Sequence, residues 1–164
     1  MSVHLGILQT DSVLEDLQPR FGDYPQMFEG LFRELDPGMT FTTYNVQHAL
    51  PDNLECDAYL ITGCKLSVYD DLPWIRELAS FVRQAIEAKK KILGICFGHQ
   101  LIAHFFGGEA GPASAGWGVG VQTSDLVMTH GWMGNVNQTP SQLHLVASHK
   151  DQVLKLPEGA EVFA

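Results

Sequence analysis

The 164-residue sequence is poor in positive charge and in cysteine. Ten Lys and Arg stand against nineteen Asp and Glu, which gives a formal net charge of -9 at pH 7. Because phosphate binding needs a basic surface and only Lys89, Lys90 and Lys91 cluster, we expect no nucleic-acid partner. The three cysteines have no paired spacing, which argues against a disulfide framework and indicates a reducing compartment. The sequence therefore predicts a cytoplasmic protein.

The sequence also lacks a long apolar run, a secretion signal and a metal motif. The longest apolar candidate is interrupted by His99, Gln100 and His104, and the first residues have neither a basic region nor an apolar core. We therefore expect no contact with a membrane. The spacing of the histidines, cysteines and acids matches no zinc site, so neither a metal nor another cofactor is expected.

Apolar periodicity predicts alternating strands and helices in the first two thirds of the chain. Apolar or β-branched runs predict strands at 3–8, 39–46, 58–62 and 92–95, and helical spacing predicts helices at 24–35, 74–89 and 99–106. Residues 10–23 and 63–73 are expected to be loops. This pattern is typical of an α/β fold with an open, mostly parallel sheet and helices on both faces. Ligands of such sheets bind at the carboxyl ends of the strands.

The last third of the chain has a different character. Residues 107–120 contain six glycines, and the run 116–120 precedes a strand-like segment, so it does not fit a dinucleotide-binding loop. We expect a loop that leads into strands at 119–128 and 143–148, a polar turn at 148–151, and a further strand that starts at Glu161. Because the chain ends on an apolar segment without a turn, we expect one domain over 1–164 whose C-terminal part is missing.

The segment around Cys96 is the strongest candidate for chemistry. Cys96 stands between Gly94 and Gly98, after an apolar strand and before a helix. A residue at such a sharp turn needs neighbours without side-chain bulk. Its sulfur would face unpaired N–H groups at the start of the helix, which favour a thiolate and can hold an oxyanion. We therefore predict that Cys96 is an acyl-transfer nucleophile.

The alternative for any cysteine is a buried apolar role, and it is the expectation for Cys56 and for the thiol of Cys64. His99 is expected to pack or to cap, and not to react. Tryptophans 74, 117 and 132 are expected to be packing residues.

The run Gly94-Ile95-Cys96-Phe97-Gly98-His99-Gln100 resembles the triad (class I) glutamine amidotransferases, in particular the group similar to the glutaminase domain of guanosine monophosphate synthetase. Three further segments are similar to that group. They are Ile61–Cys64 followed by Ser67–Asp70, which resembles its oxyanion loop, then Gly116–Gly120, and Ser148–Val153, which resembles the border of its glutamine pocket. The resemblance implies a flavodoxin-like fold.

The resemblance also implies a reaction. Cys96 would attack the side-chain amide of glutamine and release ammonia, and water would then hydrolyse the γ-glutamyl thioester. The implied oxyanion donors are the backbone N–H groups of Phe97, Gly63 and Cys64, and the implied substrate contacts are Gln100, Ser148 and His149. The expected partner is glutamine or a γ-glutamyl compound. Because no nucleotide-binding loop is present, a synthetase or acceptor partner would act in trans.

The sequence departs from the family at the catalytic base. The family carries its histidine and glutamate in a His-x-Glu motif, and no His-x-Glu occurs here. We therefore expect little or no glutaminase turnover from residues 1–164 alone, with His149 as the first alternative base to test.

Three other functions remain open. They are a γ-glutamyl peptidase, a non-catalytic binding module and, less well supported, a chaperone or protease relative. Release of an amino acid in place of ammonia would identify the peptidase. A His-x-Glu encoded beyond Ala164 would favour an enzyme, and a stop codon there would favour the module.

Overall fold

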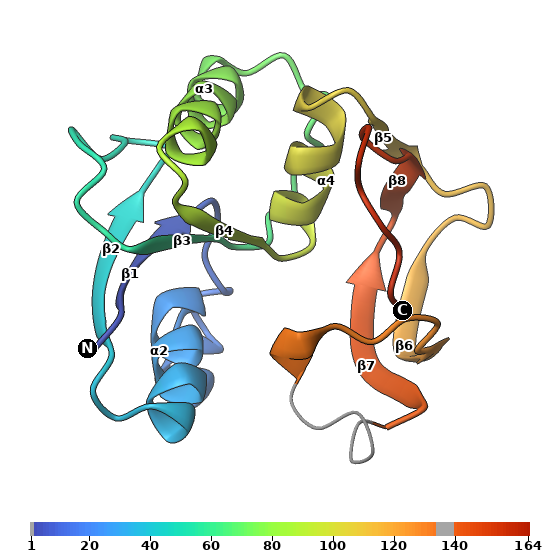
Figure 1. Cartoon of the computed structure of the whole chain (residues 1–164), viewed down its shortest axis with the longest axis horizontal. Helices are drawn as coiled ribbons and strands as arrows, with labels where there is room; N and C mark the ends of the chain where they lie inside the picture. Colours follow the sequence, from blue (N-terminus) through green and yellow to red (C-terminus); the bar gives the residue numbers. More distant parts are fainter. Residues whose placement is uncertain (1, 134–139) are drawn as a thin grey trace.

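A four-stranded parallel sheet forms the centre of the computed structural model, which describes residues 2–133 and 140–164. Its strands are β1 (His4–Gln9), β2 (Thr40–Asn45), β3 (Ala58–Ile61) and β4 (Lys91–Gly94), in the order β2-β1-β3-β4. All three strand pairs are parallel, so the carboxyl ends of the strands lie along one edge (Figure 1). The predicted parallel sheet is confirmed.

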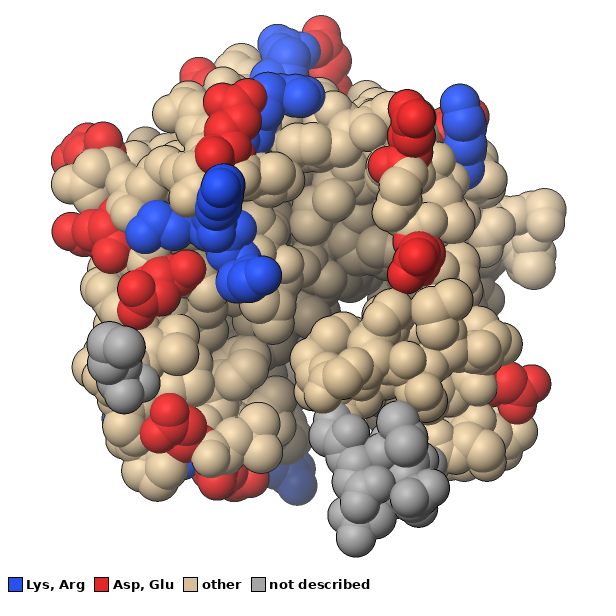
Figure 2. Space-filling model, in the orientation of Figure 1, with Lys and Arg blue, Asp and Glu red and all other residues tan. Residues whose placement is uncertain are grey.

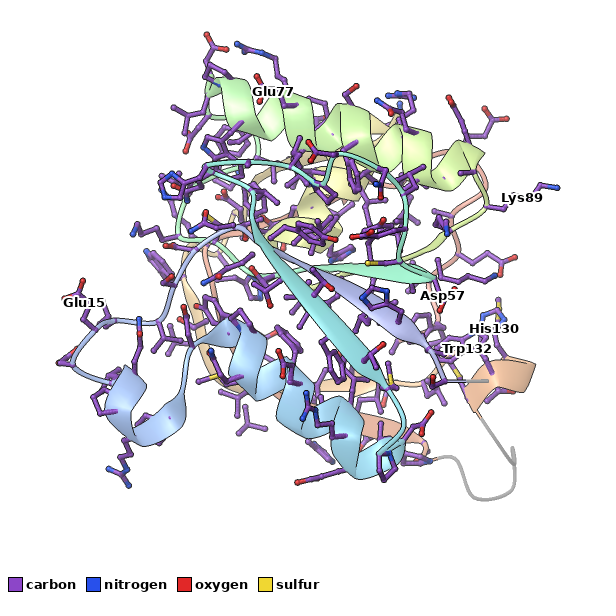
Figure 3. The ribbon with its side chains drawn as sticks, turned by 90° about the vertical axis from the view of Figure 1, so that its left-hand side faces the viewer. Glu15, Asp57, Glu77, Lys89, His130 and Trp132 are labelled. Carbon is purple, nitrogen blue, oxygen red and sulfur yellow. The ribbon has the colours of Figure 1, made fainter. Side chains whose placement is uncertain are left out.

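Helices cover both faces of the sheet. Helix α2 (Tyr24–Leu35) lies on one face, and α3 (Pro73–Glu87) and α4 (Phe97–Phe105) lie on the other (Figures 1 and 3). Each face has its own apolar core. Leu5, Ile7 and Leu60 pack with residues of α2, whereas Leu8, Tyr59 and Ile61 pack with residues of α3 and α4. Because successive strand residues serve opposite faces, the central strand β3 is apolar and buried throughout.

The segment between β1 and α2 contains a short helix, α1 (Gln18–Phe21), where the sequence predicts only a loop. Pro19 in its first turn supports the helix start. The next helix, α2, begins with a capping box in which the Asp23 carboxylate accepts from the Tyr24 N–H and the Gln26 side chain accepts from the Asp23 N–H. Because 10–23 is polar in composition, its sequence gives no sign of helix α1.

Two antiparallel pairs form the last third of the chain. Strands β6 (Gly118–Asp125) and β7 (Gln142–His149) form the predicted hairpin, and β5 (Glu109–Pro112) pairs with β8 (Asp151–Lys155). A short 3-10 turn, η1 (Gly131–Met133), follows β6. No pattern in the sequence predicts β5 or β8. The strand predicted from Glu161 is wrong, because 161–164 does not form a strand. Its contacts include Val127 N–H to Phe163 O at 2.9 Å and the Phe163 ring against Trp132 at 5.5 Å between centroids.

The tryptophans divide into two groups. Trp74 stacks on Phe97 at 5.7 Å between ring centroids, as expected of a packing residue. Trp117 and Trp132 are 67% and 71% exposed, so neither lies in a core, although Trp132 stacks on His130 at 5.9 Å and meets Phe163 edge-on at 5.5 Å between centroids. Both lie in the last third of the chain, where two-stranded sheets leave much apolar surface uncovered. Within the described ranges, no helix has the length and apolar character needed to cross a membrane.

Candidate active site

Cys96 occupies the turn between β4 and α4 in a backbone conformation that few L residues adopt, with φ 51° and ψ -101°. The two flanking glycines are required by close backbone contacts. A Cβ on Gly94 would lie 2.5 Å from the Gly98 carbonyl carbon, and a Cβ on Gly98 would lie 2.7 Å from Ile61 Cβ. The predicted sharp turn is therefore present, and its geometry explains both glycines.

The turn after β3 meets Cys96 at the carboxyl edge of the sheet. A Cβ on Gly63 would lie 3.6 Å from Cys96 Cβ. Two buried hydroxyls hold this turn, because Thr10 Oγ1 donates to Gly63 O at 2.9 Å and lies 2.9 Å from Thr62 Oγ1. Neither Thr10 nor Thr62 is predicted as a site residue from the sequence, although Thr62 ends a predicted strand and Thr10 begins the predicted loop 10–23.

The thiol of Cys96 is free and the residue is exposed. Its sulfur lines a cleft, and the partial loss of water there raises the pKa of the thiol above its ordinary value. The Phe97 backbone N–H acts in the opposite direction, and the Asp151 carboxylate raises the pKa further. The predicted stabilisation of a thiolate by the helix start is thus present, but the cleft outweighs it.

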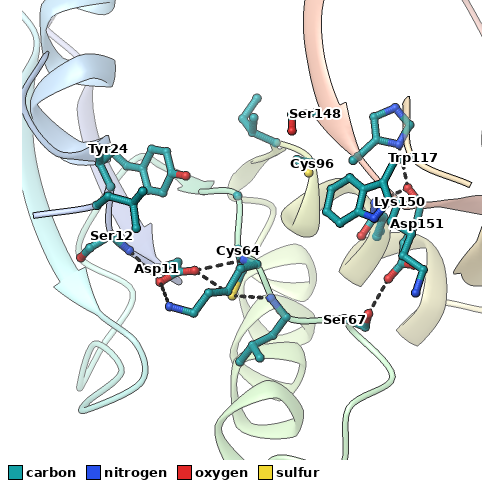
Figure 4. Close-up of a pocket in the computed structure, with 18 of the residues that line it drawn as sticks. Asp11, Ser12, Tyr24, Cys64, Ser67, Cys96, Trp117, Ser148, Lys150 and Asp151 are labelled. Atoms are coloured by element: carbon teal, nitrogen blue, oxygen red, sulfur yellow. Dashed lines mark hydrogen bonds and ion pairs between the residues drawn. The ribbon is translucent and has the colours of Figure 1, made fainter. Parts of the chain in front are cut away.

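A cleft of about 770 Å³ extends to both sides of Cys96. In Figure 4, Asp11, Ser12 and Tyr24 lie on one side of Cys96, and Trp117 and Asp151 lie on the other. The cleft volume lies within the range of about 300–1,000 Å³ that is typical of small-molecule sites. A smaller hollow of about 200 Å³ adjoins it. The smaller hollow is lined by Cys96, His99, Gln100, His149, Asp151, Gln152 and Val153.

All of the predicted substrate contacts line the larger cleft, but they differ in their present interactions. Gln100 is 7% exposed, and its Nε2 donates to Asp151 O at 2.9 Å, so it is not a solvated helix residue. His149 Nδ1 lies 3.0 Å from the same oxygen. Because a carbonyl oxygen only accepts, Nδ1 carries a proton in this contact, and in the neutral ring Nε2 has the lone pair. Ser148 is exposed at the end of β7.

Asp151 is the residue that the sequence analysis places wrongly. It is 8% exposed and begins β8, so that only Lys150 of the predicted polar turn 148–151 lies between strands. Its carboxylate accepts from Ser67 Oγ at 2.5 Å and from Tyr69 Oη at 3.1 Å. The contact joins the loop after β3 to β8 across the cleft. The polar character of 67–70 and 148–151 is evident in the sequence, but only the folded structure shows that the two segments are hydrogen-bonded to each other.

The other two cysteines have no comparable setting. Burial raises the pKa of Cys64 to about 11, and its sulfur accepts from the Leu66 N–H at 3.4 Å, while Asp11 binds the neighbouring Lys65 N–H at 3.0 Å. Cys56 is fully buried near His4 and Tyr44, as expected of an apolar cysteine. Among residues 2–133 and 140–164, no three His, Cys, Asp or Glu side chains are arranged to hold one metal ion.

Comparison with known proteins gives the following matches. Residues 24–164 match the family model described as glutamine amidotransferase class-I. The chain is 34% identical over 152 residues to gamma-glutamyl peptidase 5 of Arabidopsis thaliana, which covers 88% of this chain and 59% of that protein. It is 38% identical over 96 residues to a glutamine-hydrolyzing GMP synthase component of Methanocaldococcus jannaschii, covering 56% of this chain and 47% of that protein. The chain spans about three fifths of the peptidases that it matches.

Solved structures share the fold at low sequence identity. A glutamine amidotransferase of Thermotoga maritima superposes with a TM-score of 0.76 at 18% identity, over 96% of this chain and 64% of that one. A glutamine amidotransferase of Methylobacillus flagellatus gives 0.73 at 22% identity, over 97% and 59%. The arrangement of the parallel sheet and its helices is therefore shared with these domains.

Proposed function

The chain belongs to the class I glutamine amidotransferase family, and we propose on that basis that it is a glutamine amidotransferase-type hydrolase with Cys96 as its nucleophile. The observation that carries the proposal is the placement of Cys96. A free thiol stands on a strained turn at the carboxyl edge of the sheet, faces a cleft, and has the Gly63 turn beside it. We treat residues 1–164 as one amidotransferase-like domain.

The reaction follows from that placement. The Cys96 thiolate attacks the γ-carbonyl carbon, and the C=O electron pair moves to oxygen to give a tetrahedral oxyanion. Backbone N–H groups of Phe97, Gly63 and Cys64 stabilise this oxyanion. The general base, which has taken the thiol proton, returns it to the nitrogen as the intermediate collapses, so that the C–N bond breaks and the amine leaves neutral. Water then attacks the thioester, which releases glutamate and restores the thiol.

The γ-glutamyl group carries an α-ammonium and an α-carboxylate at one end, and both charges need polar partners. We assign its α-amino acid end to the side of the cleft formed by Gln100, Ser148 and His149, because side-chain and backbone polar groups converge there. Asp151 fixes this side to the loop after β3 through Ser67 and Tyr69. An interaction that holds both walls together would keep the oxyanion donors and the substrate contacts in register.

Two substrates fit this chemistry. With free glutamine the amine is ammonia, which a synthetase or acceptor in trans would use. With a γ-glutamyl peptide the amine is an amino acid, and the 34% identity to a gamma-glutamyl peptidase supports this second candidate. The chemistry at the sulfur is the same, so the two functions differ in the group that leaves.

Of the groups that the reaction needs, the general base has the weakest support among the residues that line the cleft. His149 is the candidate, because its Nε2 keeps a lone pair and the side chain lines the same hollow as Cys96. Without a His-x-Glu pair, we expect little or no steady-state turnover from residues 1–164. Measurable release of ammonia or amino acid that is lost in Cys96→Ala would contradict this, and its loss in His149→Asn would identify His149 as the base.

A glutamine analogue that alkylates thiols tests the nucleophile without turnover. Mass spectrometry should find the label on Cys96, and excess glutamine should protect it. The Cys64 thiol in the same cleft is the internal control and should stay unlabelled, because its pKa is about 11 and it is held in its loop. Absence of label from Cys96, or label that glutamine does not suppress, would count against the proposal.

A further inference from the structure

The side of the cleft opposite to Gln100 and His149 differs from it in chemistry. Besides Asp11, Ser12 and Lys65, it is lined by apolar or aromatic side chains, Val13, Leu14, Leu17, Tyr24 and Phe28. Leu14 is 69% exposed and Leu17 is 41% exposed, so this wall presents its apolar surface to the open cleft. Ammonia has no apolar surface to match such a wall.

The charges on this side are paired with each other. The Asp11 carboxylate accepts from the Lys65 backbone N–H at 3.0 Å, and the Lys65 ammonium lies 3.3 Å from its other oxygen. The hydroxyl of Tyr24 stays protonated, because partial burial and the nearby Asp11 raise its pKa. The wall therefore offers apolar contact without an unpaired charge, which suits an uncharged side chain and not the zwitterionic end of a γ-glutamyl group.

The wall is also a built part of the fold. Gln9, which is 8% exposed, donates through Nε2 to Asp11 O at 3.1 Å, to Ser12 Oγ at 3.0 Å and to the Asp23 carboxylate at 2.7 Å. The Asp23 carboxylate also accepts from the Val13 N–H at 2.8 Å. The capping carboxylate of α2 thus holds the segment after β1 in place beside the cleft.

From these observations we propose that the Leu14–Tyr24 side of the cleft binds the leaving group, and that the substrate is a γ-glutamyl compound whose leaving amine carries an apolar or aromatic side chain. The inference rests on the proposed function, because Cys96 must attack the γ-carbonyl. A carbonyl carbon at the Cys96 sulfur has the glutamyl chain on one side and the leaving nitrogen on the other. Figure 4 shows Cys96 between the two walls, as this requires.

Binding to the Cys96→Ala form of the 164-residue chain tests the inference without turnover. Calorimetry with γ-glutamyl-phenylalanine, γ-glutamyl-glycine and glutamine should give a Kd for the phenylalanine compound at least about tenfold below that for the glycine compound, because only the former buries an aromatic side chain. In both Leu14→Asp and Tyr24→Ala, the ratio of these two Kd values should fall toward one. Leu35→Asp, which changes a leucine that is 76% exposed outside the cleft, should keep the ratio.

Each outcome decides one of the two proposals. If glutamine binds but the two peptides bind with equal Kd, the proposal of a leaving-group wall is wrong and the proposed function stands. The same holds if the ratio of the two Kd values is unchanged in both Leu14→Asp and Tyr24→Ala. If none of the three compounds binds, the proposed function fails and the inference fails with it.

Discussion

At the scale of single residues, the position of Cys96 is set by the main chain and its reactivity by its surroundings. Its φ of 51° and the two flanking glycines place the sulfur at the cleft. Burial in the cleft and the Asp151 carboxylate raise the pKa of the thiol, while the Phe97 N–H lowers it. The structure therefore presents a thiol that needs a base before it can act as a nucleophile at neutral pH.

Alkylation of Cys96 by iodoacetamide should accelerate as pH rises, with a midpoint above the ordinary pKa of a cysteine thiol. Only the thiolate reacts, and a raised pKa moves thiolate formation to higher pH. Asp151→Asn should lower that midpoint, since it removes a negative charge that opposes the thiolate, so alkylation at a pH of about 8 should become faster.

Mass spectrometry resolved by residue would measure the rate at Cys96 alone. Glu158→Gln removes an exposed carboxylate elsewhere on the chain and should leave the midpoint unchanged. A midpoint that stays fixed or rises in Asp151→Asn would show that the carboxylate does not act on the thiol through its charge.

At the scale of helices and strands, the close backbone contacts at the turn between β4 and α4 leave no room for an added side-chain carbon. Gly98→Ala would place a Cβ 2.7 Å from both Ile61 Cβ and Ile61 O. The collision involves backbone, so neighbouring side chains cannot relieve it, and we expect a loss of about 1–3 kcal/mol in the free energy of unfolding.

Gly30→Ala is the matched control for Gly98→Ala. Gly30 lies within α2, and a Cβ there would meet nothing within 4 Å. Alanine favours a helix over glycine, so this variant should gain about 0.5–1 kcal/mol. Urea unfolding followed by circular dichroism would measure both changes, and equal effects of the two substitutions would contradict the packing argument.

The sequence predicts the elements of the parallel sheet well, because each carries a local signal. The apolar run over 58–62 and the helical spacing over 74–89 reflect burial that neighbouring residues share. Strands β5 and β8 have no such signal. Asp151 looks like a turn residue until Ser67 and Tyr69, more than 80 residues earlier, supply its hydrogen bonds. Hydrogen bonds between residues so far apart in the sequence form only when the chain folds, so no single segment predicts them.

The candidate site divides in the same way. The glycine frame identifies Cys96, and the strand ends place Gly63 beside it, as the structure has them. The apolar wall at Leu14 and Tyr24 escapes prediction, because 10–23 has the composition of an ordinary loop. Its order comes from buried Gln9 and from Asp23, whose roles appear only when β1 and α2 are side by side.

At the scale of the whole molecule, the β6–β7 hairpin leaves an apolar surface uncovered. Val119, Val121 and Val146 are 73%, 68% and 85% exposed, and the register places Val121 opposite Val146 on one face of the hairpin. Strand β4 is an edge strand of the parallel sheet and exposes Leu93. In Figure 2, few charged side chains appear over the hairpin. Exposed edges and apolar patches of this kind promote association.

We expect the 164-residue chain to self-associate as its concentration rises, and more strongly near its pI of about 5.0 than at a pH of about 8. The net charge of -9 at neutral pH opposes association, and this repulsion vanishes at the pI. Sedimentation velocity would measure the change. Val146→Lys should reduce association, whereas Val3→Lys, at a site that is 38% exposed outside the hairpin, should not. A chain that stays monomeric at high concentration at both pH values would contradict this expectation.

The turn at Cys96 has one more consequence. Glycine contacts and backbone hydrogen bonds, such as those from Ile95 N–H to Ile61 O and from Gly98 N–H to Ile95 O, fix the location of the reacting atom. Serine or selenocysteine at this position would thus place its reacting atom at the same point beside the cleft. Oxygen or selenium would replace sulfur there, so the reactivity of the nucleophile would change while the fold around the turn stayed the same.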